Sequence, residues 1–409
     1  MKITTVKGTN DYLPEEVKLR DYIQTKILNT YIDGGFERIM TPAVEDIENL
    51  DKSDGGDNLN LIFKIMKRGD KLAKAIAAGN EQDLCDMGLR YDLTLPLSRY
   101  YANNRVKLLI PAKCIQIDKV YRAERPQKGR LREFVQCDID IIGSSSINSE
   151  IELIYTTAKA LLSIGISDFK VKINDRRILK SLLLNAGFEE EQLDSVCITF
   201  DKMDKIGPDG IKAELLEKQF DKTAIDKFTK IIENPLTLDN IKGICDEEAV
   251  GNIEKIVSAV KELSDNKYDI VFDISLVRGQ GYYTGTVFEI VSDKFKGSIA
   301  GGGRYDNLIG KFTGEQIPAV GFSIGFERIF AMLSEGGYNI PDSKKKIALL
   351  HDWDNIVDAV KDAEKLRESY DVSLYEKPKK LSKFLDRLKE NGFFGFCFAG
   401  ETDDIRELK

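Results

Sequence analysis

Residues 120–143, "VYRAERPQKGRLREFVQCDIDIIG", place a crowded group of basic residues between two segments that alternate like β-strands. Side chains alternate between the two faces of a strand, so residues two apart share a face. In the strand predicted for 134–142, one face carries Phe134, Gln136, Asp138 and Asp140. In the strand predicted for 114–122, one face carries Gln116, Asp118, Val120 and Arg122. The pattern predicts a hairpin with a polar face able to bind a polar ligand, although a sheet with one solvated side gives the same alternation.

The loop of this hairpin is strongly basic, with Arg122, Arg125, Lys128, Arg130 and Arg132. Like charges so close together repel one another unless an anion lies among them. Arginine side chains suit phosphate and carboxylate groups, because their N–H donors match the spacing of the oxygens. The loop therefore predicts an anion site, with a solvated basic loop as the alternative.

The composition is that of an ordinary globular protein: 409 residues, 42% hydrophobic and 31% charged. Such a length allows two or three domains with substantial cores. No apolar run approaches a membrane span, and the N-terminus lacks the apolar core of a signal peptide. The six cysteines are scattered and form no C-x-x-C pair, which favours reduced thiols. We therefore expect a cytoplasmic protein with no membrane partner.

Charge and histidine content narrow the possible chemistry. A net charge of -8 disfavours a protein that coats nucleic acid over its whole surface, but it permits a local basic patch. The chain has one histidine, His351, which excludes Ser-His-Asp and Cys-His catalysis and any site that needs two imidazoles. Chemistry must therefore depend on arginines, carboxylates, backbone groups or a bound metal ion.

Periodicity and composition predict the order of the elements along the chain. Apolar residues at helical spacing predict helices over 15–33 and 148–163. Residues 178–265 are rich in lysine and glutamate and predict a mainly helical insertion. Residues 331–345 read as a linker. Residues 346–409 read strand, helix, strand, helix, strand, which is the order of a small α/β domain with parallel strands.

Further candidate site residues lie in a glycine-rich segment. In "LVRGQGYYTGTVFEI" (276–290), Arg278, Tyr282 and Tyr283 surround glycines between β-like runs. Glycine lets a ligand approach the backbone, and adjacent tyrosines can pack on a ring and hydrogen-bond at its edge. A hairpin turn with surface tyrosines is the alternative. The glycines of "AGGGRYDNLIG" (300–310) are a weak signal, because the segment lacks a P-loop's Lys-Ser/Thr.

Two more segments offer charged groups next to predicted element ends. In "LRYDLTLPLSRYY" (89–101), Asp92 and Thr94 share one side of an extended run before Pro96. A carboxylate there could hold an amino group, or it could be the N-cap of a helix after Pro96. "AVGFSIGFERIF" (319–330) reads as a strand entering a helix, with Arg328 near the helix start, where a surface arginine is the ordinary explanation.

In this order, these segments resemble those of the histidyl-tRNA synthetases, a family of class II aminoacyl-tRNA synthetases. "KGTNDYLPEE" is similar to the family's opening segment, and "GGFERIMTPAVE" to class II motif 1, with Pro42 as its proline. "YRAERPQKGRLREFVQCDIDIIG" closely resembles motif 2, and "GFSIGFERI" resembles motif 3. "LVRGQGYYTG" and "AGGGRYD" resemble the two histidine-specific signatures.

The resemblance implies an α+β fold: an antiparallel class II sheet flanked by helices, with a helical insertion and a small C-terminal α/β domain. The catalytic domain would span 1–330 with the insertion at 178–265, followed by the linker at 331–345 and a shortened anticodon-binding-like domain at 346–409. The implied activity is ligation of histidine to tRNA(His) through histidyl-adenylate, with ATP and Mg²⁺. A homodimer through the motif 1 region is also implied.

The resemblance also implies a role for each candidate residue, and it assigns none as a metal ligand. Arg122, Arg278 and Arg328 would be the catalytic arginines, with Arg122 bridging the α-phosphate and the histidine carboxylate and Arg278 beside the α-phosphate. The ATP-binding residues would be Arg122, Glu124, Arg130, Phe134 and Arg328. The histidine-binding residues would be Asp92, Thr94, Gln136, Asp140, Arg278, Tyr282 and Tyr283.

Two departures from the family pattern lead to an alternative function. Gln280-Gly281 stand where the family usually has Leu-Asp, and the C-terminal domain is short and not basic overall. The alternative is a non-catalytic histidine sensor, similar to the regulatory subunit of ATP phosphoribosyltransferase. Such relatives tend to lose the signature arginine and parts of motif 2, whereas Arg122, Glu124, Arg130, Arg278 and Arg328 are all present in this chain.

Overall fold

The structure is a computed structural model that describes residues 3–52, 60–126, 130–233, 236–277 and 283–408. By contacts, the chain divides into two compact units, Met1–Tyr338 and Asn339–Lys409. None of the described helices is both long and apolar enough to cross a membrane.

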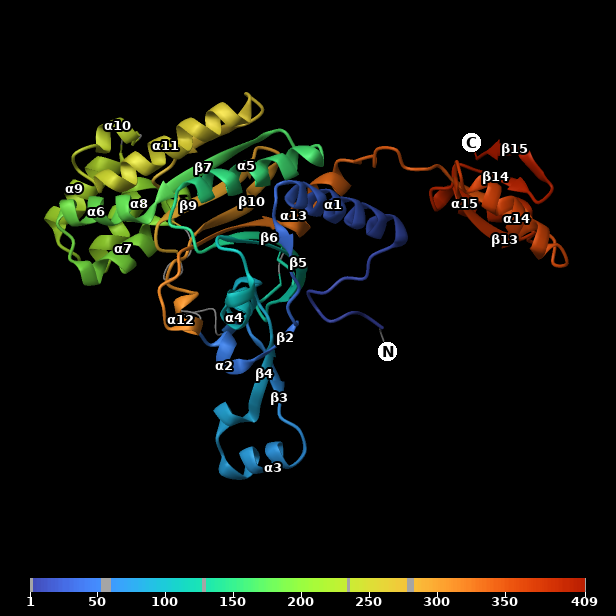
Figure 1. Ribbon diagram of the computed structural model, residues 1–409. Coiled ribbons are helices and arrows are strands. Elements are labelled where there is room, and N and C mark those ends of the chain that lie inside the picture. The colour runs from blue at the N-terminus through green and yellow to red at the C-terminus, as the bar shows by residue number, and fades with distance from the viewer. Residues whose placement is uncertain (1–2, 53–59, 127–129, 234–235, 278–282, 409) are drawn as a thin grey trace. The chain divides into compact units, whose positions relative to one another are not determined.

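An eight-stranded sheet forms the centre of the larger unit, in the order β1-β5-β6-β11-β10-β9-β7-β8 (Figure 1). Neighbouring strands are antiparallel, except that β1 with β5 and β7 with β8 are parallel pairs at the two edges. The strands are β1 (Glu37–Arg38), β5 (Ala112–Tyr121), β6 (Glu133–Ile142), β7 (Phe169–Asp175), β8 (Asp269–Phe272), β9 (Thr286–Ser292), β10 (Phe295–Arg304) and β11 (Ala319–Gly325). The predicted antiparallel sheet is confirmed.

The predicted hairpin is the pair β5–β6 near one edge of this sheet. Gln116 on β5 lies opposite Asp138 on β6, which in turn lies opposite Ser323 on β11. The other face of β6 is apolar and buried, formed by Val135, Cys137, Ile139 and Ile141. The period of two in the sequence therefore separates a buried face from a polar face, as predicted.

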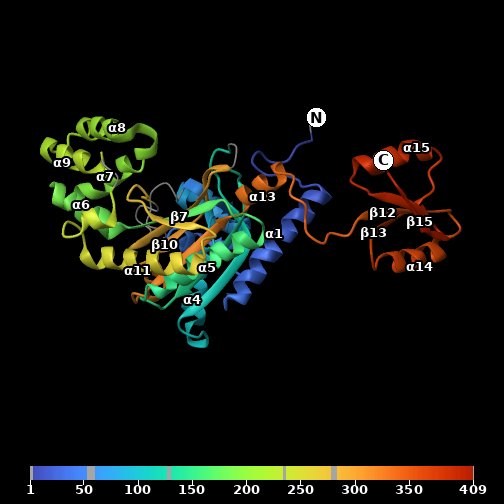
Figure 2. The same ribbon diagram turned by 90° about the horizontal axis from the view of Figure 1, so that it is seen from above.

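Helices cover the apolar face of the sheet. Those that pack together there are α1 (Pro14–Asp33), α5 (Asn148–Ser163), α11 (Glu247–Ser264) and α13 (Phe326–Glu335) (Figures 1 and 2). Helix α1 begins with a proline, whose fixed φ suits the first turn, followed by two glutamates that favour the N-terminal end of the helix. Its buried residues, spaced three or four apart, include Leu19, Ile23, Ile27 and Tyr31. This covering leaves the polar face of β5, β6 and β11 for the site.

The predicted insertion is helical, as expected. It comprises α6 (Arg176–Ala186), η4 (Glu190–Gln192), α7 (Leu193–Phe200), α8 (Met203–Glu217), α9 (Lys222–Ile232), α10 (Leu238–Ile241) and α11. Aromatic side chains pack edge to face in its core, where the ring centroids of Phe200 and Phe228 are 5.3 Å apart. The insertion therefore has a small apolar core of its own.

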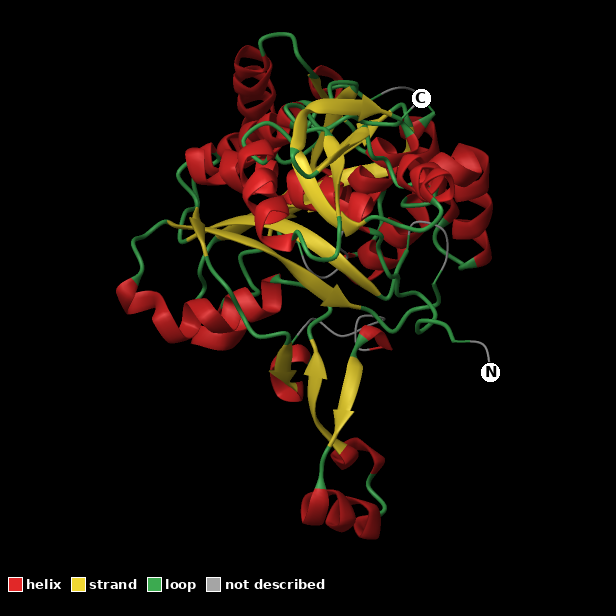
Figure 3. Cartoon of the chain, turned by 90° about the vertical axis from the view of Figure 1, so that its right-hand side faces the viewer, coloured by secondary structure: helices red, strands yellow, loops and turns green. Residues whose placement is uncertain are grey.

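A three-stranded sheet with the order β2-β4-β3 extends away from the large sheet, with α3 at its far end (Figure 3). Its strands and associated helices are β2 (Val44–Asp46), α2 (Ile47–Leu50), β3 (Phe63–Met66), α3 (Gly69–Ala78), η2 (Glu81–Leu84) and β4 (Cys85–Leu89). The remaining helices of the larger unit are α4 (Thr94–Asn104), η3 (Arg105–Lys107) and α12 (Gly310–Thr313). Helix α4 begins two residues before Pro96, so the helix expected after Pro96 starts earlier than predicted.

The smaller unit has a four-stranded sheet with the order β13-β12-β14-β15. Its elements are β12 (Lys346–His351), α14 (Ile356–Leu366), β13 (Asp371–Glu376), α15 (Leu381–Glu390), β14 (Gly395–Phe398) and β15 (Glu401–Glu407). The three parallel strands confirm the predicted α/β order, and β15 adds an antiparallel strand that the sequence did not predict. Trp353, between β12 and α14, is 82% exposed.

Candidate active site

Two cavities lie on the polar face of the large sheet. The larger has a volume of about 420 Å³ and the smaller about 180 Å³. The residues that line both cavities are Arg122, Gln136, Tyr283, Gly301 and Ser323. Because they share these walls, ligands in the two cavities would lie next to each other, with Arg122 between them.

The larger cavity brings together the predicted ATP-binding residues, which are Arg122, Glu124, Arg130, Phe134 and Arg328. Arg122 is fixed by a hydrogen bond of 3.0 Å from Nε to the Tyr91 carbonyl, and its guanidinium lies 5.0 Å from the centre of the Phe134 ring. Arg130 is 3.4 Å from the carboxylate of Glu124. Arg328, on α13, donates to the carbonyl of Ser298. Arginines from separate elements thus converge on one cavity that could hold a polyanion.

The smaller cavity brings together the described residues of the predicted histidine set, which are Asp92, Thr94, Gln136, Asp140 and Tyr283. Arg278 and Tyr282, and the departure at Gln280-Gly281, lie outside the described residues. The Oδ1 of Asp92 also accepts a hydrogen bond of 3.2 Å from the Leu95 amide in the first turn of α4. Asp92 thus lines the cavity and satisfies one amide at the start of α4, although Leu93 is the N-cap residue of that helix.

Asp140 lies at the end of the smaller cavity that the larger cavity does not reach. Its Oδ1 accepts a hydrogen bond of 2.5 Å from the Tyr305 hydroxyl. A Cβ at Gly321, opposite on β11, would come 2.0 Å from the same oxygen, so only glycine allows this approach. Burial raises the pKa of Asp140 to about 7, and burial raises the pKa of Asp92 to about 6.

The raised pKa of Asp140 predicts a pH-dependent stability difference between the protein and Asp140→Asn. The folded state holds a proton on Asp140 that the unfolded state releases, so folding is favoured at low pH and this advantage is lost as pH rises towards 7. The free energy of unfolding of the unsubstituted protein should therefore fall, relative to that of Asp140→Asn, as the pH is raised from 4 to about 7. Thermal unfolding of both proteins without ligand across this pH range measures the difference. A difference independent of pH would contradict the raised pKa.

The walls of the site are held by side chains to which the sequence pattern assigned no individual role. Glu327, next to Arg328, receives two hydrogen bonds from Arg20 of α1, at 2.6 and 2.7 Å, and one of 3.2 Å from the Val135 amide on β6. Glu327 thus joins α1, α13 and β6 beneath the larger cavity. Gln116 accepts a hydrogen bond from Thr41 and donates to the Leu93 carbonyl, both at 2.9 Å, which fixes the chain just before Thr94.

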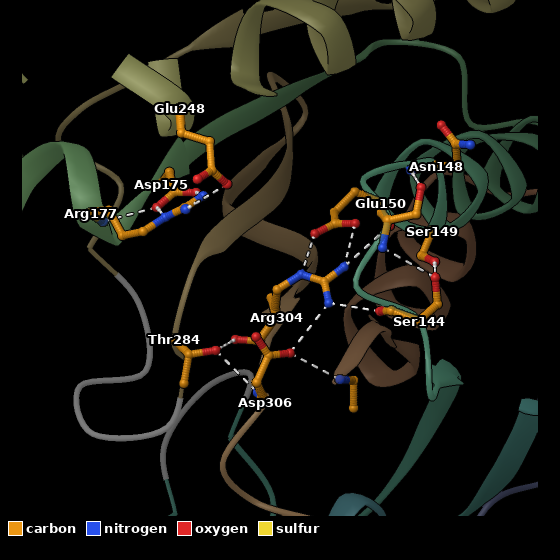
Figure 4. Close-up of polar contacts among 12 residues, drawn as sticks. Ser144, Asn148, Ser149, Glu150, Asp175, Arg177, Glu248, Thr284, Arg304 and Asp306 are labelled. Atoms are coloured by element: carbon orange, nitrogen blue, oxygen red, sulfur yellow. Dashed lines mark hydrogen bonds and ion pairs between the residues drawn. The ribbon is translucent and has the colours of Figure 1, made fainter. Parts of the chain in front are cut away.

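A buried ion pair holds the glycine-rich strand β10 and the chain that follows Tyr283 (Figure 4). Arg304 donates two hydrogen bonds of 2.7 Å to Glu150, which is fully buried on α5. The Arg304 carbonyl accepts a hydrogen bond of 2.7 Å from the Thr284 amide. Arg176 donates a hydrogen bond of 2.7 Å to the Tyr283 carbonyl. The backbone on which Tyr283 enters both cavities is therefore fixed from two sides.

Tyr305, Ser323 and Glu327 are site residues that sequence reasoning missed. Each is part of a segment that was recognised, "AGGGRYD" or "GFSIGFERI", but none was considered individually. Tyr305 and Ser323 line the smaller cavity, and Glu327 lines the larger. Because side chains alternate between the two faces of a strand, the segment 319–325 could have been predicted to place Ser323 on the same face as Gly321. That face lies beside the polar row of β6.

The sequence profile described as "Histidyl-tRNA synthetase" matches residues 8–329, which is more than half of the chain. The chain belongs to the histidyl-tRNA synthetase family. Within this family, the "Histidine--tRNA ligase" of Leifsonia xyli subsp. xyli is 40% identical, covering 97% of this chain and 95% of the relative. That of Christiangramia forsetii is 33% identical, covering 98% of this chain and 93% of the relative.

Solved structures of the histidyl-tRNA synthetase family agree with the fold. Histidyl-tRNA synthetase from Nostoc sp. PCC 7120 superimposes with a TM-score of 0.80 at 26% identity, covering 97% of this chain and 91% of that chain. A Bacillus halodurans protein described as "ATP phosphoribosyltransferase regulatory subunit/histidyl-tRNA synthetase" has a TM-score of 0.79 at 21% identity, with 98% of both chains covered. At that identity the second likeness shows the fold alone.

Proposed function

We propose that this protein is a histidine--tRNA ligase, which activates histidine with ATP and transfers the histidyl group to tRNA(His). The observation that carries the proposal is the pair of cavities that share Arg122, one lined by arginines and the other by carboxylates. A triphosphate needs the first environment and an amino acid with a cationic amino group needs the second. The resemblance to the family's motifs supports catalysis over histidine sensing, because sensor relatives tend to lose the signature arginine and parts of motif 2, and this chain keeps Arg122, Glu124, Arg130, Arg278 and Arg328.

In the larger cavity, the proposed ligand is ATP. Arg130 and Arg328 would hold its terminal phosphates, Glu124 would accept from the adenine edge, and Phe134 would stack on the adenine ring. Their common location in one cavity of about 420 Å³ supports these roles. Ring stacking on an aromatic side chain suits adenine, because both present flat π-faces.

In the smaller cavity, the proposed ligand is histidine. Asp92, Thr94 and Gln136 would bind its α-amino group and the surroundings of that group, and Asp140, Tyr282 and Tyr283 would line the imidazole pocket. The resemblance supports the roles of Arg278 and Tyr282. A carboxylate oxygen of histidine would attack the α-phosphorus in line, and pyrophosphate would leave. Charge that develops on the phosphate oxygens would be stabilised by Arg122 and Arg278, so the step needs no protein nucleophile.

Mg²⁺ is proposed to accompany ATP. Among the described ranges, no group of three or more histidine, cysteine, aspartate or glutamate side chains could hold a metal ion by itself. Glu124 and Glu327 line the larger cavity, and both already contact arginines. Mg²⁺ commonly binds through substrate phosphates and water with few protein ligands, and it would neutralise phosphate charge there.

The proposed organisation assigns catalysis to 1–330 with the insertion at 178–265, a linker to 331–345, and anticodon contact to the α/β domain at 346–409. The division of the chain between Tyr338 and Asn339 falls within the proposed linker, although α13 extends to Glu335 and therefore occupies its first five residues. A cytoplasmic location is proposed as well. All six cysteines are free thiols in the structure, five of them buried, which suits a reducing compartment.

A homodimer through the motif 1 region is proposed from exposed apolar side chains near the sheet edge at β1. Met40 follows β1, and Val106, Leu109 and Ile110 precede β5; all four are more than half exposed. Such exposure is costly in a monomer and typical of an interface.

Sedimentation equilibrium should give twice the chain mass of 46.1 kDa, and Leu109→Glu should shift the mass towards that of one chain. A monomeric parent protein would contradict the dimer.

One assay in two stages tests the proposed activity. The protein is mixed with ATP, Mg²⁺, histidine and labelled pyrophosphate, and tRNA is then added. Exchange of label into ATP followed by charging of tRNA is the expected result. Exchange without charging would instead indicate an adenylate-forming relative, and histidine binding without exchange would indicate a sensor.

A further inference from the structure

Asp138 is a carboxylate of the smaller cavity to which the family resemblance assigns no role. It lies on β6 midway along the polar row Gln136, Asp138, Asp140, and its side chain lines the cavity. The residue is only 4% exposed. Its Oδ1 is buried and has no hydrogen-bond partner among the described residues, while Ser323 provides a hydrogen bond to the side chain.

A buried carboxylate oxygen without a partner is costly, and most such atoms in native proteins are satisfied by protein, water or ligand. Burial raises the pKa of Asp138 well above its usual range, and the neighbouring Asp140 and Asp92 carboxylates raise it further. Arg122 is the cation that opposes this effect. Three carboxylates facing one small space therefore favour a ligand that brings positive charge and N–H donors.

A second unpartnered acceptor lies beside Asp138. Gln136 donates through Nε2 to the Ser323 hydroxyl at 3.3 Å, but its Oε1 is buried without a partner in the described part of the chain. Two acceptors, two residues apart on one face of β6, thus both lack donors. An ammonium group carries three N–H donors and can satisfy both acceptors at once.

The position of Asp138 along β6 indicates which group of the amino acid its carboxylate would contact. Gln136 lines both cavities, so the carboxylate of the amino acid, which must reach the α-phosphate, lies at that end. Asp140 and Tyr305 line only the smaller cavity, at the end where the side chain would lie. Asp138 is between them, which corresponds to the α-carbon and its amino group.

We propose that Asp138 is a further substrate-binding residue, whose Oδ1 accepts a hydrogen bond from the α-ammonium group of the amino acid. The inference rests on the proposed function and adds a residue that selects for a cationic amino group. Asp92, Thr94 and Gln136, which line the same cavity, would contact the same group, so the ammonium would be enclosed by acceptors. An analogue without the amino group would leave Asp138 unpartnered.

The test compares two ligands on Asp138→Asn, which keeps the shape and removes the charge. Titration calorimetry on the full chain measures binding of L-histidine and of 3-(imidazol-4-yl)propanoate, which lacks the amino group. L-histidine should bind roughly 10- to 100-fold more weakly to the variant, as expected for a lost charge-assisted hydrogen bond. The affinity for the propanoate should stay the same or rise.

Thermal unfolding without ligand distinguishes substrate binding by Asp138 from a purely structural role of this residue. Burial and the neighbouring carboxylates make ionisation of Asp138 costly in the folded state, and Asp138→Asn removes this cost, so the proposal expects an unchanged or higher melting temperature. Asp86→Asn is the matched control, because Asp86 also has a buried Oδ1 without a partner in the described residues but lies on β4, outside both cavities. Asp86→Asn should leave the affinity for L-histidine unchanged.

Three outcomes would overturn the inference: unchanged L-histidine affinity in Asp138→Asn, equal losses for both ligands, or the same loss in Asp86→Asn. Failure of the unsubstituted protein to bind L-histidine would overturn the proposed function instead. The two failures are therefore distinguishable in one set of titrations.

Discussion

Arg122→Ala should lower the rate of histidine-dependent exchange between ATP and pyrophosphate by roughly 100- to 1,000-fold. This is the effect of removing one fixed donor to charge that develops in a transition state, about 3 kcal/mol of barrier. Arg122 lines both cavities, and its hydrogen bond to the Tyr91 carbonyl holds the guanidinium in place before any ligand arrives. The interaction is thus preorganised, so little reorganisation is needed during the reaction.

Two further variants make this result specific. Arg122→Lys keeps the charge but loses the planar fork, so it should restore only part of the rate. Arg367→Ala removes an exposed arginine of the smaller unit that pairs with Glu364, and it should leave exchange unchanged. Exchange at the full rate in Arg122→Ala, in a protein that melts normally, would remove Arg122 from the mechanism.

Glu150→Ala should lower the free energy of unfolding of the larger unit by about 3–5 kcal/mol. Replacing a buried ion pair by apolar residues is often neutral, but removing one partner leaves an uncompensated buried charge. Arg304 would keep contacts with the Ser144 carbonyl at 3.0 Å and Asp306 at 3.3 Å, yet would lose both hydrogen bonds to Glu150. Urea unfolding followed by far-ultraviolet circular dichroism measures the change.

The exposed ion pair of Arg105 and Glu315 provides the matched control, since the nitrogen–oxygen distance is a similar 2.8 Å. Glu315→Ala should cost no more than about 1 kcal/mol, because water already solvates both groups. The double substitution of Glu150 and Arg304 by apolar residues should recover part of the loss. Equal losses for Glu150→Ala and Glu315→Ala would show that burial of the pair has no energetic consequence.

The elements with a clear period were predictable from the sequence. The alternation of 134–142 gave the polar face of β6, and the helical spacing of 148–163 gave α5. The start of α4 was misjudged, because Pro96 was taken as preceding the helix, although proline fits its first turn. Strand β15 was missed because its sequence, "ETDDIRE", is almost wholly polar and its pairing with β14 gives an exposed edge.

The candidate site was predictable where a motif carried it. The arginines of the hairpin loop and the carboxylates of β6 are dense enough to indicate a polar ligand, and the family resemblance supplied the proposed roles. The Tyr305–Asp140 and Arg304–Glu150 contacts join residues 165 and 154 positions apart, and neither has a local pattern. Such contacts depend on the pairing of β6, β10 and β11, which only the folded sheet brings together.

Trp353 is the sole tryptophan of the chain, and it is exposed in the smaller unit. Its emission would therefore report on Asn339–Lys409 without interference from the 338 residues before it. Quenching of this signal by added tRNA would follow docking of the smaller unit in real time, with no label attached. Both cavities are lined by residues of Met1–Tyr338, a unit that contains no tryptophan, so ATP and histidine bound there would have no tryptophan neighbour within their own unit.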